Sequence, residues 1–263
     1  MTADDQPGAT EAPGLSLSPD ATRVLALIDA SRQSLAALSA AVDLAVDVRA
    51  ELIALFVQDL DLIDSAAFPF AREVGASTGL ARPLNRQALE SSLAGQVRRV
   101  TQAVDAAVAG RELRHQLQVS RGRVASEALS QATLTDVLVL GKAGLSARWG
   151  WRLGSTSRRL ILEAPCTVII WDERHSPSPG PLRYFRGEEP RLPWGDSLET
   201  AARSAPLFRG REELAPMSAE SLEHLLAQAR SGALIINRET LARLIAQDPE
   251  MLARIPIPVV VVP

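Results

Sequence analysis

Residues 137–157 read VLVLGKAGLSARWGWRLGSTS, and this stretch decides the fold. It opens with four consecutive apolar residues, a run typical of a strand buried on both faces. Gly141 and Gly144 follow, then nine further residues, and then Gly154 with a run of hydroxyl side chains. These positions are Gly141, Gly144, Gly154, Ser155, Thr156 and Ser157. The apolar spacing after them predicts a helix over 155–162. A buried strand, a glycine-bearing loop and a helix in this order favour an α/β protein.

The chain before and after this stretch alternates between predicted strands and helices. Strands are predicted over 23–28, 51–57, 112–119, 135–140 and 166–170. Helices are predicted over 35–48, 86–109, 124–132 and 155–162. Parallel neighbours need crossover connections, so the alternation over 23–171 indicates a parallel sheet flanked by helices. Residues 58–85 read as a long loop with a short helix, and the sequence leaves the roles of this loop and of Trp149 and Trp151 open.

The glycines and hydroxyl residues of the opening stretch favour an anion site. Glycine lets the backbone approach a ligand where a Cβ atom would clash. Free N–H groups at a helix N-terminus attract anions, and residues 154–157 would supply them together with their hydroxyls. The alternative, that Gly141 and Gly144 turn the chain and Ser155 caps the helix, remains open. The loop is not a Walker A motif, and no G-x-G-x-x-G fingerprint follows the first strand.

Together with Asp29-Ala-Ser31 at the end of the first predicted strand, this pattern resembles the universal stress proteins of the UspA type. The resemblance covers residues 23–171 and rests on the strand–helix order, on Asp29 and on the Gly-x2-Gly-x9-Gly-Ser spacing. The family usually has glycine where this chain has Ala30. The resemblance implies an open five-stranded parallel sheet of the adenine nucleotide alpha hydrolase-like class. It also implies that ATP, with or without Mg²⁺, binds at the carboxyl ends of the strands.

The resemblance assigns roles to individual residues. Asp29 should contact the adenosine, Val57 should line the adenine pocket, and Leu140 and Gly141 should lie under the ribose and phosphates. The phosphates would be held by Gly144, Gly154, Ser155, Thr156 and Ser157. For Asp29 a turn or capping role, and for Val57 a place in the plain core, remain open.

The composition changes after residue 172. Five prolines within 176–194 indicate a linker, and order is predicted again after Ser218, ending in a strand over 257–262. The last elements repeat the order strand, helix and strand with proline before the final strand, which suggests a truncated second copy. The predicted divisions are a disordered tail over 1–21, a nucleotide-binding domain over 22–172, a proline-rich linker or irregular segment over 173–217, and a degenerate second copy over 218–263.

The second copy lacks the features of the first site. Asn237-Arg-Glu-Thr240 follows its first predicted strand and contains no glycine, so we expect no nucleotide there. The resemblance implies that its final strand lies beside the strand containing Val168, as in family dimers and tandem repeats. Pairing would then be intramolecular, and a homodimer remains open.

Composition excludes several functions. The formal net charge of −3 argues against a nucleic-acid binder, which needs a basic excess. The single Cys166 excludes an internal disulfide, and the three histidines share no metal-ligand spacing. Neither a signal peptide nor an apolar run of about 18 residues is present, which predicts no membrane contact and a cytoplasmic location.

The sequence therefore predicts a non-enzymatic protein of stress response or signalling, in which ATP shifts a conformational equilibrium or the binding of an unidentified protein partner. No nucleophile–base pair stands out. Two alternatives remain open: a nucleotide-free interaction module, and a nucleotide-using α/β enzyme such as an adenylyl transferase or ATP pyrophosphatase. Those enzymes need an H-x-G-H or S-G-G-x-x-S loop near the first strand, where this chain has Asp29-Ala-Ser-Arg32.

Overall fold

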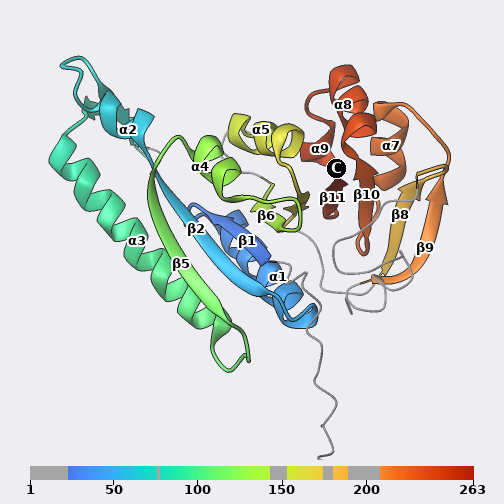
Figure 1. The fold of residues 1–263 in the computed structure, drawn as a ribbon. Helices are drawn as coiled ribbons and strands as arrows, with labels where there is room; N and C mark the ends of the chain where they lie inside the picture. Colours follow the sequence, from blue (N-terminus) through green and yellow to red (C-terminus); the bar gives the residue numbers. More distant parts are fainter. Residues whose placement is uncertain (1–22, 76–77, 143–152, 174–179, 189–207) are drawn as a thin grey trace, which may run out of the picture.

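The computed structural model describes residues 23–75, 78–142, 153–173, 180–188 and 208–263. These residues build one nine-stranded sheet with helices on both faces (Figure 1). We call residues 23–173 the first half and residues 180–263 the second half. The tail predicted to be disordered, 1–21, lies outside the described residues. Among the helices of the described ranges, none is long and apolar enough to cross a membrane.

The first half forms the predicted five-stranded parallel sheet. Its strands are β1 (Arg23–Ile28), β2 (Glu51–Asp59), β5 (His115–Gly122), β6 (Val137–Gly141) and β7 (Thr167–Trp171). They run in the order β5-β2-β1-β6-β7, and every neighbouring pair is parallel. After β1 the chain forms β2 and then β5 on one side of β1, and it then crosses back to form β6 and β7 on the other side. Because the strand order reverses beside β1, a crevice is expected at the carboxyl ends of β1 and β6.

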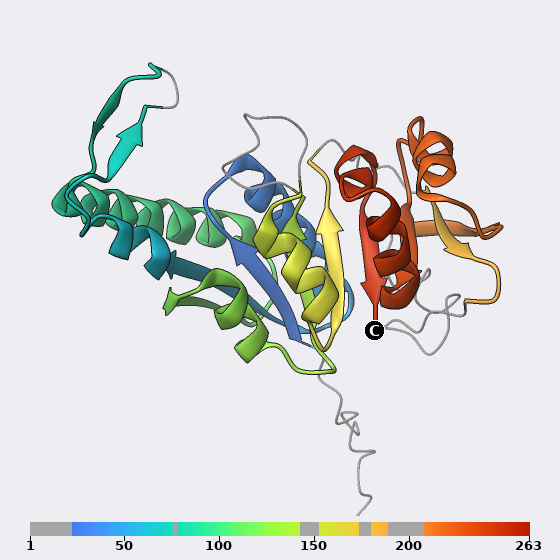
Figure 2. The ribbon, with the colours of Figure 1, turned by 90° about the horizontal axis from the view of Figure 1, so that it is seen from above.

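Strands β1, β2, β6 and β7 are buried on both faces, which explains their nearly continuous apolar sequences, whereas most of the edge strand β5 is exposed or half-buried. The covering helices are α1 (Arg32–Asp47), α3 (Arg86–Val108), α4 (Val124–Gln131) and α5 (Ser155–Glu163). The core divides into two clusters, one with α1 and α3 and the other with α4 and α5 (Figure 2). Alternate residues of β1 enter the two clusters: Ala26 packs on the α1 side, and Leu25 packs with Leu160 of α5.

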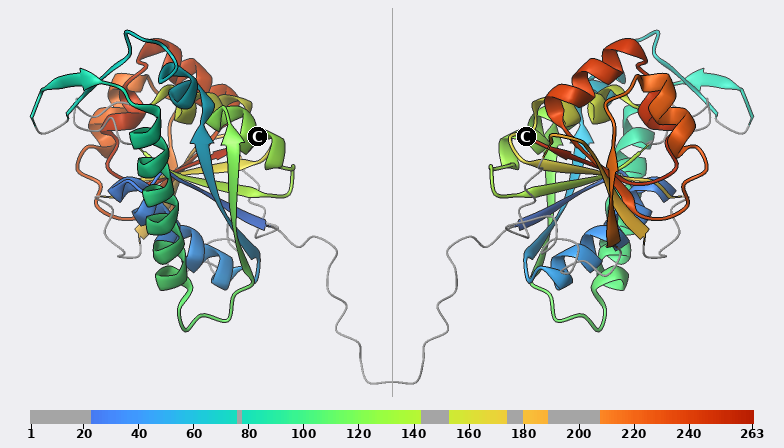
Figure 3. Two further views of the ribbon diagram at one scale, coloured as in Figure 1. Left: turned by 90° about the vertical axis from the view of Figure 1, so that its left-hand side faces the viewer. Right: turned by 90° about the vertical axis from the view of Figure 1, so that its right-hand side faces the viewer.

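Residues 58–85 contain the predicted short helix and more order than expected. Helix α2 (Leu60–Ser65) is followed by a two-stranded antiparallel hairpin of β3 (Arg72–Val74) and β4 (Ala81–Pro83). The hairpin projects from the body of the molecule (Figure 3). At its base the rings of Phe68 and Phe70 stack with centroids 5.5 Å apart.

The second half repeats most of the first. Its elements are β8 (Gly180–Phe185), β9 (Phe208–Leu214), α7 (Ala219–Leu226), β10 (Ala233–Asn237), α8 (Arg238–Gln247), α9 (Met251–Arg254) and β11 (Val259–Val262). The parallel order β9-β8-β10-β11 matches β2-β1-β6-β7. Of the five strands that the first half contributes to the large sheet, only β5 has no counterpart among the described residues of the second half.

The segment 173–217 was expected to be a linker or irregular, but it contains strands β8 and β9. The prolines obscured this signal, because proline cannot donate to a strand ladder and argues against a central strand. Pro181 is tolerated because it stands second in β8, where the register with β9 shifts between Gly180 and Leu182. The second copy is therefore less truncated than the sequence indicates.

The two halves join through an antiparallel pair at the middle of the sheet. Strand β11 lies beside β7, with Val261 opposite Val168, which confirms the predicted intramolecular pairing. All four residues of β11 are buried.

Two cations reinforce this junction, the buried Lys142 and the half-buried Arg238. The Lys142 Nζ atom lies 2.9 Å from Asp172 Oδ2 and also donates to the carbonyl of Ile255 in the second half. Both partners of the ion pair are almost completely buried, with side-chain exposures of 4% and 1%. From the second half, Arg238 donates at 2.9 Å to each of two first-half carbonyls, those of Ile161 and Cys166. Each half thus supplies a cation to backbone oxygens of the other.

Breaking the buried ion pair should destabilise the chain strongly. Lys142→Met should lower the free energy of unfolding by about 3 kcal/mol, because the buried ion pair with Asp172 and the bond to the Ile255 carbonyl are both lost. The double variant Lys142→Met/Asp172→Leu should lose clearly less than the two single variants added together. Urea denaturation measures all four proteins. Arg86→Met, which removes the exposed pair with Glu90, is the control and should cost below about 0.5 kcal/mol. Additive losses in the double variant would contradict the prediction.

Candidate functional site

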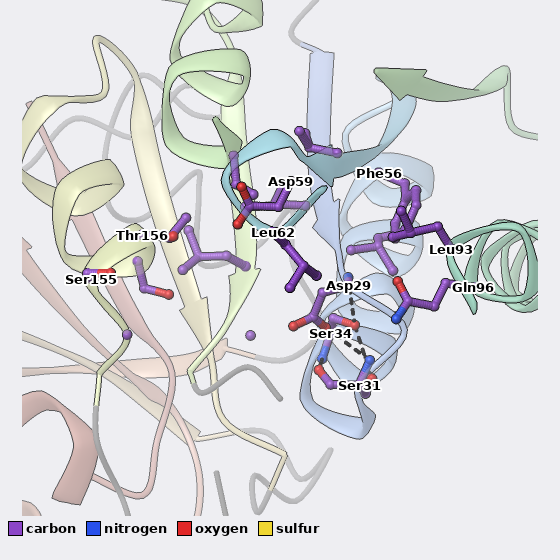
Figure 4. Close-up of a pocket in the computed structure, with 18 residues that line it drawn as sticks. Asp29, Ser31, Ser34, Phe56, Asp59, Leu62, Leu93, Gln96, Ser155 and Thr156 are labelled. Atoms are coloured by element: carbon purple, nitrogen blue, oxygen red, sulfur yellow. Dashed lines mark hydrogen bonds between the residues drawn. The ribbon is translucent and has the colours of Figure 1, made fainter. Parts of the chain in front are cut away.

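A cavity of about 400 Å³ opens at the carboxyl ends of β1, β2 and β6. This size lies within the range of small-molecule pockets, roughly 300–1,000 Å³. The position is the crevice that the strand order predicts. Figure 4 shows side chains from four parts of the first half around it. Those labelled are Asp29, Ser31, Ser34, Phe56, Asp59, Leu62, Leu93, Gln96, Ser155 and Thr156.

Eight of the nine residues singled out from the sequence line this one cavity. They are Asp29, Val57, Leu140, Gly141, Gly154, Ser155, Thr156 and Ser157. The ninth, Gly144, lies outside the described residues, as do Trp149 and Trp151. Residues separated by more than a hundred positions are thus brought together by the reversal of the strand order.

One end of the cavity is the N-terminus of α5. The helix begins after Gly154, which makes no side-chain capping bond, and its first backbone bond runs from Arg158 N to Gly154 O at 3.0 Å. The N–H groups and hydroxyls of residues 155–157 have no hydrogen-bond partner among the described residues. The helix dipole adds partial positive charge at this point. This end of the cavity can therefore hold an anion.

Arg158 and Arg159 follow these hydroxyl residues, but they pair elsewhere. Arg158 donates to the carbonyl of Pro249 at 3.1 Å, and Arg159 bonds Glu163 at 2.9 Å. Among the described lining residues there is no lysine or arginine, whereas two are acidic, Asp29 and Asp59. The attraction for an anion therefore comes from backbone and hydroxyl groups within this part of the chain.

Asp29 shapes the loop between β1 and α1. Its Oδ1 atom accepts from the Ser31 N–H at 3.0 Å, and its own N–H donates to Ser34 Oγ at 3.3 Å. Ser31 caps α1, accepting from the Ser34 N–H at 3.1 Å. The turn role that the sequence left open for Asp29 is real, and it coexists with a place in the cavity lining. The Oδ2 atom makes no hydrogen bond to the described residues.

The two described glycines of the motif have different structural roles. A Cβ atom on Gly141 would lie 2.7 Å from the backbone carbon of Gln33 and 2.8 Å from its oxygen. Gly141 therefore permits close packing of β6 against the start of α1. A Cβ atom on Gly154 would meet nothing within 4 Å. Because Gly154 lines the cavity, its missing side chain leaves room there for a ligand.

Several lining residues were not found from the sequence. Phe56 was hidden within a predicted core strand, and Asp59 lies just beyond the predicted end of that strand. Leu93 and Gln96 come from α3, a helix whose apolar stripe predicts packing but not a place in a cavity. Gln96 stands three residues after the buried Leu93, so the helical period could have placed it on the inward side.

The corresponding place in the second half holds a side chain of the protein itself. Glu188 follows β8 and reaches the N-terminus of α8, the counterpart of α5. Its Oε2 atom accepts from the Asn237 N–H at 3.2 Å, and its Oε1 atom accepts from Thr240 Oγ1 at 2.6 Å. Asn237 also caps the helix, accepting from the Thr240 N–H at 2.7 Å. A carboxylate of the chain itself thus lies at this helix N-terminus, where an external anion would otherwise bind.

Cys166 directly precedes β7, is fully buried in the core and does not line the cavity. Burial raises the pKa of its thiol to about 11. The thiolate, which is the reactive form, is therefore scarce near neutral pH. Cys166 is a core residue, as its place at a strand start suggests.

Ala30 stores backbone strain beside the cavity. Its φ angle is +62°, in the left-handed region that costs an alanine roughly 1–2 kcal/mol. Ala30→Gly should therefore raise the free energy of unfolding by about 1 kcal/mol. Thermal and urea unfolding measure the change. Ala132→Gly is the matched control, because φ at Ala132 is −80° and glycine there should not stabilise. Equal effects at the two positions would argue against strain at Ala30.

Comparisons with known proteins find a matching family and solved structures with a similar fold. The model of the universal stress protein family matches residues 21–171. A search of curated proteins gives no match. A universal stress protein from Archaeoglobus fulgidus is 13% identical, with a TM-score of 0.51 over 92% of this chain and 98% of that one. A functionally unknown protein from Pseudomonas aeruginosa is 8% identical, with a TM-score of 0.52 over 91% of this chain and 92% of that one. The universal stress protein UspA from Lactobacillus plantarum is 24% identical, covering 57% of this chain and 97% of that one with a TM-score of 0.43.

The Archaeoglobus and Pseudomonas structures cover both halves, so their likeness extends to the fold of the second half. The family match covers more than half of the 263 residues and contains every lining residue of the cavity. The chain belongs to the universal stress protein family.

Proposed function

We propose that this protein binds ATP in the first-half cavity and acts in stress response or signalling. The observation that carries the proposal is the convergence of eight motif residues on one cavity that ends at the N-terminus of α5. The N–H and hydroxyl groups there have no partner among the described residues, and they suit phosphate oxygens. The apolar side chains farther in, such as Phe56 and Leu93, suit a base.

The proposed action is binding rather than fast turnover. The described lining offers two carboxylates and no histidine, lysine or cysteine, so no activated nucleophile–base pair is at hand. ATP would instead shift a conformational equilibrium or the binding of a protein partner in the cytoplasm. Glu188 at the N-terminus of α8 supports a single nucleotide for each chain.

Calorimetry with ATP and Mg²⁺ tests this function. The wild type should bind about one equivalent, and Gly154→Val should abolish binding, because the valine side chain enters the open space of the cavity. Replacing glycine at a helix N-cap costs about 1 kcal/mol, so circular dichroism should show an intact fold. Gly95→Val is the matched control, because a Cβ there also has room, with Arg98 Nη2 nearest at 3.8 Å.

Outcomes other than these would contradict the proposed function or favour one of the alternatives. No binding by a folded wild type would favour the nucleotide-free interaction module. If chromatography shows that ATP is rapidly converted to ADP or AMP, the alternative of a nucleotide-using enzyme is favoured. Two equivalents would contradict the closure of the second half by Glu188.

Magnesium should strengthen ATP binding. The polyphosphate brings negative charge close to Asp29 and Asp59, and a bound cation reduces that repulsion. Chelating Mg²⁺ should weaken ATP binding by roughly tenfold, which corresponds to about 1.4 kcal/mol. Adenosine, which carries no phosphate, should bind equally well with and without Mg²⁺. A similar loss for adenosine would show that the metal acts on the protein rather than on the phosphates.

A further inference from the structure

The hairpin between α2 and α3 carries much of the exposed apolar surface of the described chain. We call its described residues, 68–75 and 78–84, the arm, which projects from the body of the molecule (Figure 3). Nine large hydrophobic residues are exposed in the described chain, and six of them lie in α2 or the arm. The four on the arm are more than half exposed: Phe68 54%, Phe70 79%, Val74 65% and Leu80 71%. Single exposed apolar residues are ordinary, but a cluster such as this marks an interaction surface.

The two strands of the arm have one polar face and one apolar face. Glu73 lies opposite Arg82 in the pairing of β3 with β4, and their side chains form an ion pair. Val74 lies opposite Ala81, and this pair is on the other face because side chains alternate along a strand. Both residues are exposed. A two-stranded hairpin alone is marginally stable in water, so covering the apolar face would stabilise the arm.

The charged side chains of residues 59–90 leave one exposed cation and one exposed carboxylate without an ionic partner. Arg72 donates to the carbonyl of Ala81 and forms no ion pair with a described residue. The carboxylate of Asp64 in α2 has neither a hydrogen bond nor an ion pair within the described chain. The half-buried Asp59 caps α2. The remaining charges of this segment are paired: Asp61 with Arg123, Glu73 with Arg82, and Arg86 with Glu90.

We propose that a second copy of this chain covers the arm, in a dimer with a two-fold axis. The apolar faces of the two arms pack together, and Arg72 of each copy pairs with Asp64 of the other. A two-fold interface uses the same surface of both partners, so an arm with one unpaired charge of each sign is complementary to itself. An anionic lipid surface would attract Arg72 but repel the exposed carboxylates of α2.

The size and the position of the arm also fit a second copy. A standard interface takes roughly 800 Å² from each partner, and four large, mostly exposed apolar side chains with their exposed neighbours supply an area of this order. The edge of β7 is already paired with β11, so a second copy cannot join the sheet there. The arm does not line the cavity, so the dimer does not depend on nucleotide binding.

Sedimentation equilibrium of the full-length chain without nucleotide tests this dimer. The wild type should be dimeric at micromolar concentration. Leu80→Glu should weaken dimerisation by about a hundredfold, because each dimer would bury the new charge twice. Leu134→Glu is the matched control, because it makes the same change at a leucine that is 77% exposed and lies outside the arm. This control should leave the dimer unchanged, and circular dichroism checks that both variants fold.

Charge reversal tests the reciprocal pairs. Arg72→Glu and Asp64→Arg should each weaken dimerisation by about tenfold or more, because each places like charges opposite one another. The double variant Arg72→Glu/Asp64→Arg restores opposite charges and should dimerise nearly as well as the wild type. A double variant weaker than both single variants would overturn the proposed pairing of these residues.

The other outcomes identify what covers the arm instead. A wild type that is monomeric even at submillimolar concentration would overturn the dimer. If that monomer binds phosphatidylglycerol vesicles and Leu80→Glu abolishes the binding, a lipid surface covers the arm. A dimer that survives Leu80→Glu, or that Leu134→Glu weakens equally, would place the interface elsewhere, such as the edge of β5, and would also overturn the proposal. Loss of the dimer with Leu80→Glu alone, together with rescue by the double reversal, would establish it.

Discussion

The antiparallel pairing of β7 with β11 is the constraint on which the molecule depends. Without it, β7 would be an exposed edge of buried, apolar residues, which invites association with other chains. The second half covers that edge from within the same chain, and both core clusters run through the junction. The contacts of Lys142 and Arg238 with carbonyls across the boundary fix the register of this join. The sheet is therefore continuous across the two halves.

The same junction explains how the cavity is supported. Lys142 follows Gly141 at the end of β6, and Arg238 bonds the carbonyl of Ile161 in the last turn of α5. The same two elements also line the cavity, β6 through Gly141 and α5 through its N-terminus. The second half therefore holds two parts of the lining, although none of its described residues lines the cavity. Movement of one half against the other would reach the cavity through these contacts.

The first half could be predicted from sequence because its signals are local. Buried strands such as 137–140 are apolar runs, and the glycine spacing after them is specific. The second half was harder to predict, because Pro181 masks a strand whose partner β9 is supplied by a distant segment. The cavity residues of α3 were missed for a related reason: Gln96 faces the site only because tertiary packing brings α3 across the end of β2. The strain at Ala30 also needed the structure, since a φ of +62° is not visible in a residue name.

Glu188 has a consequence for how the protein would respond to changing ligand levels. A carboxylate attached to the chain cannot diffuse away, so Glu188 stays beside the N-terminus of α8 at every ligand concentration. Two open cavities facing each other across a shared sheet could influence one another and give a sigmoidal response. With one of them closed internally, occupancy should rise along a simple hyperbola. Such a chain would report concentration in a graded way rather than switch at a threshold.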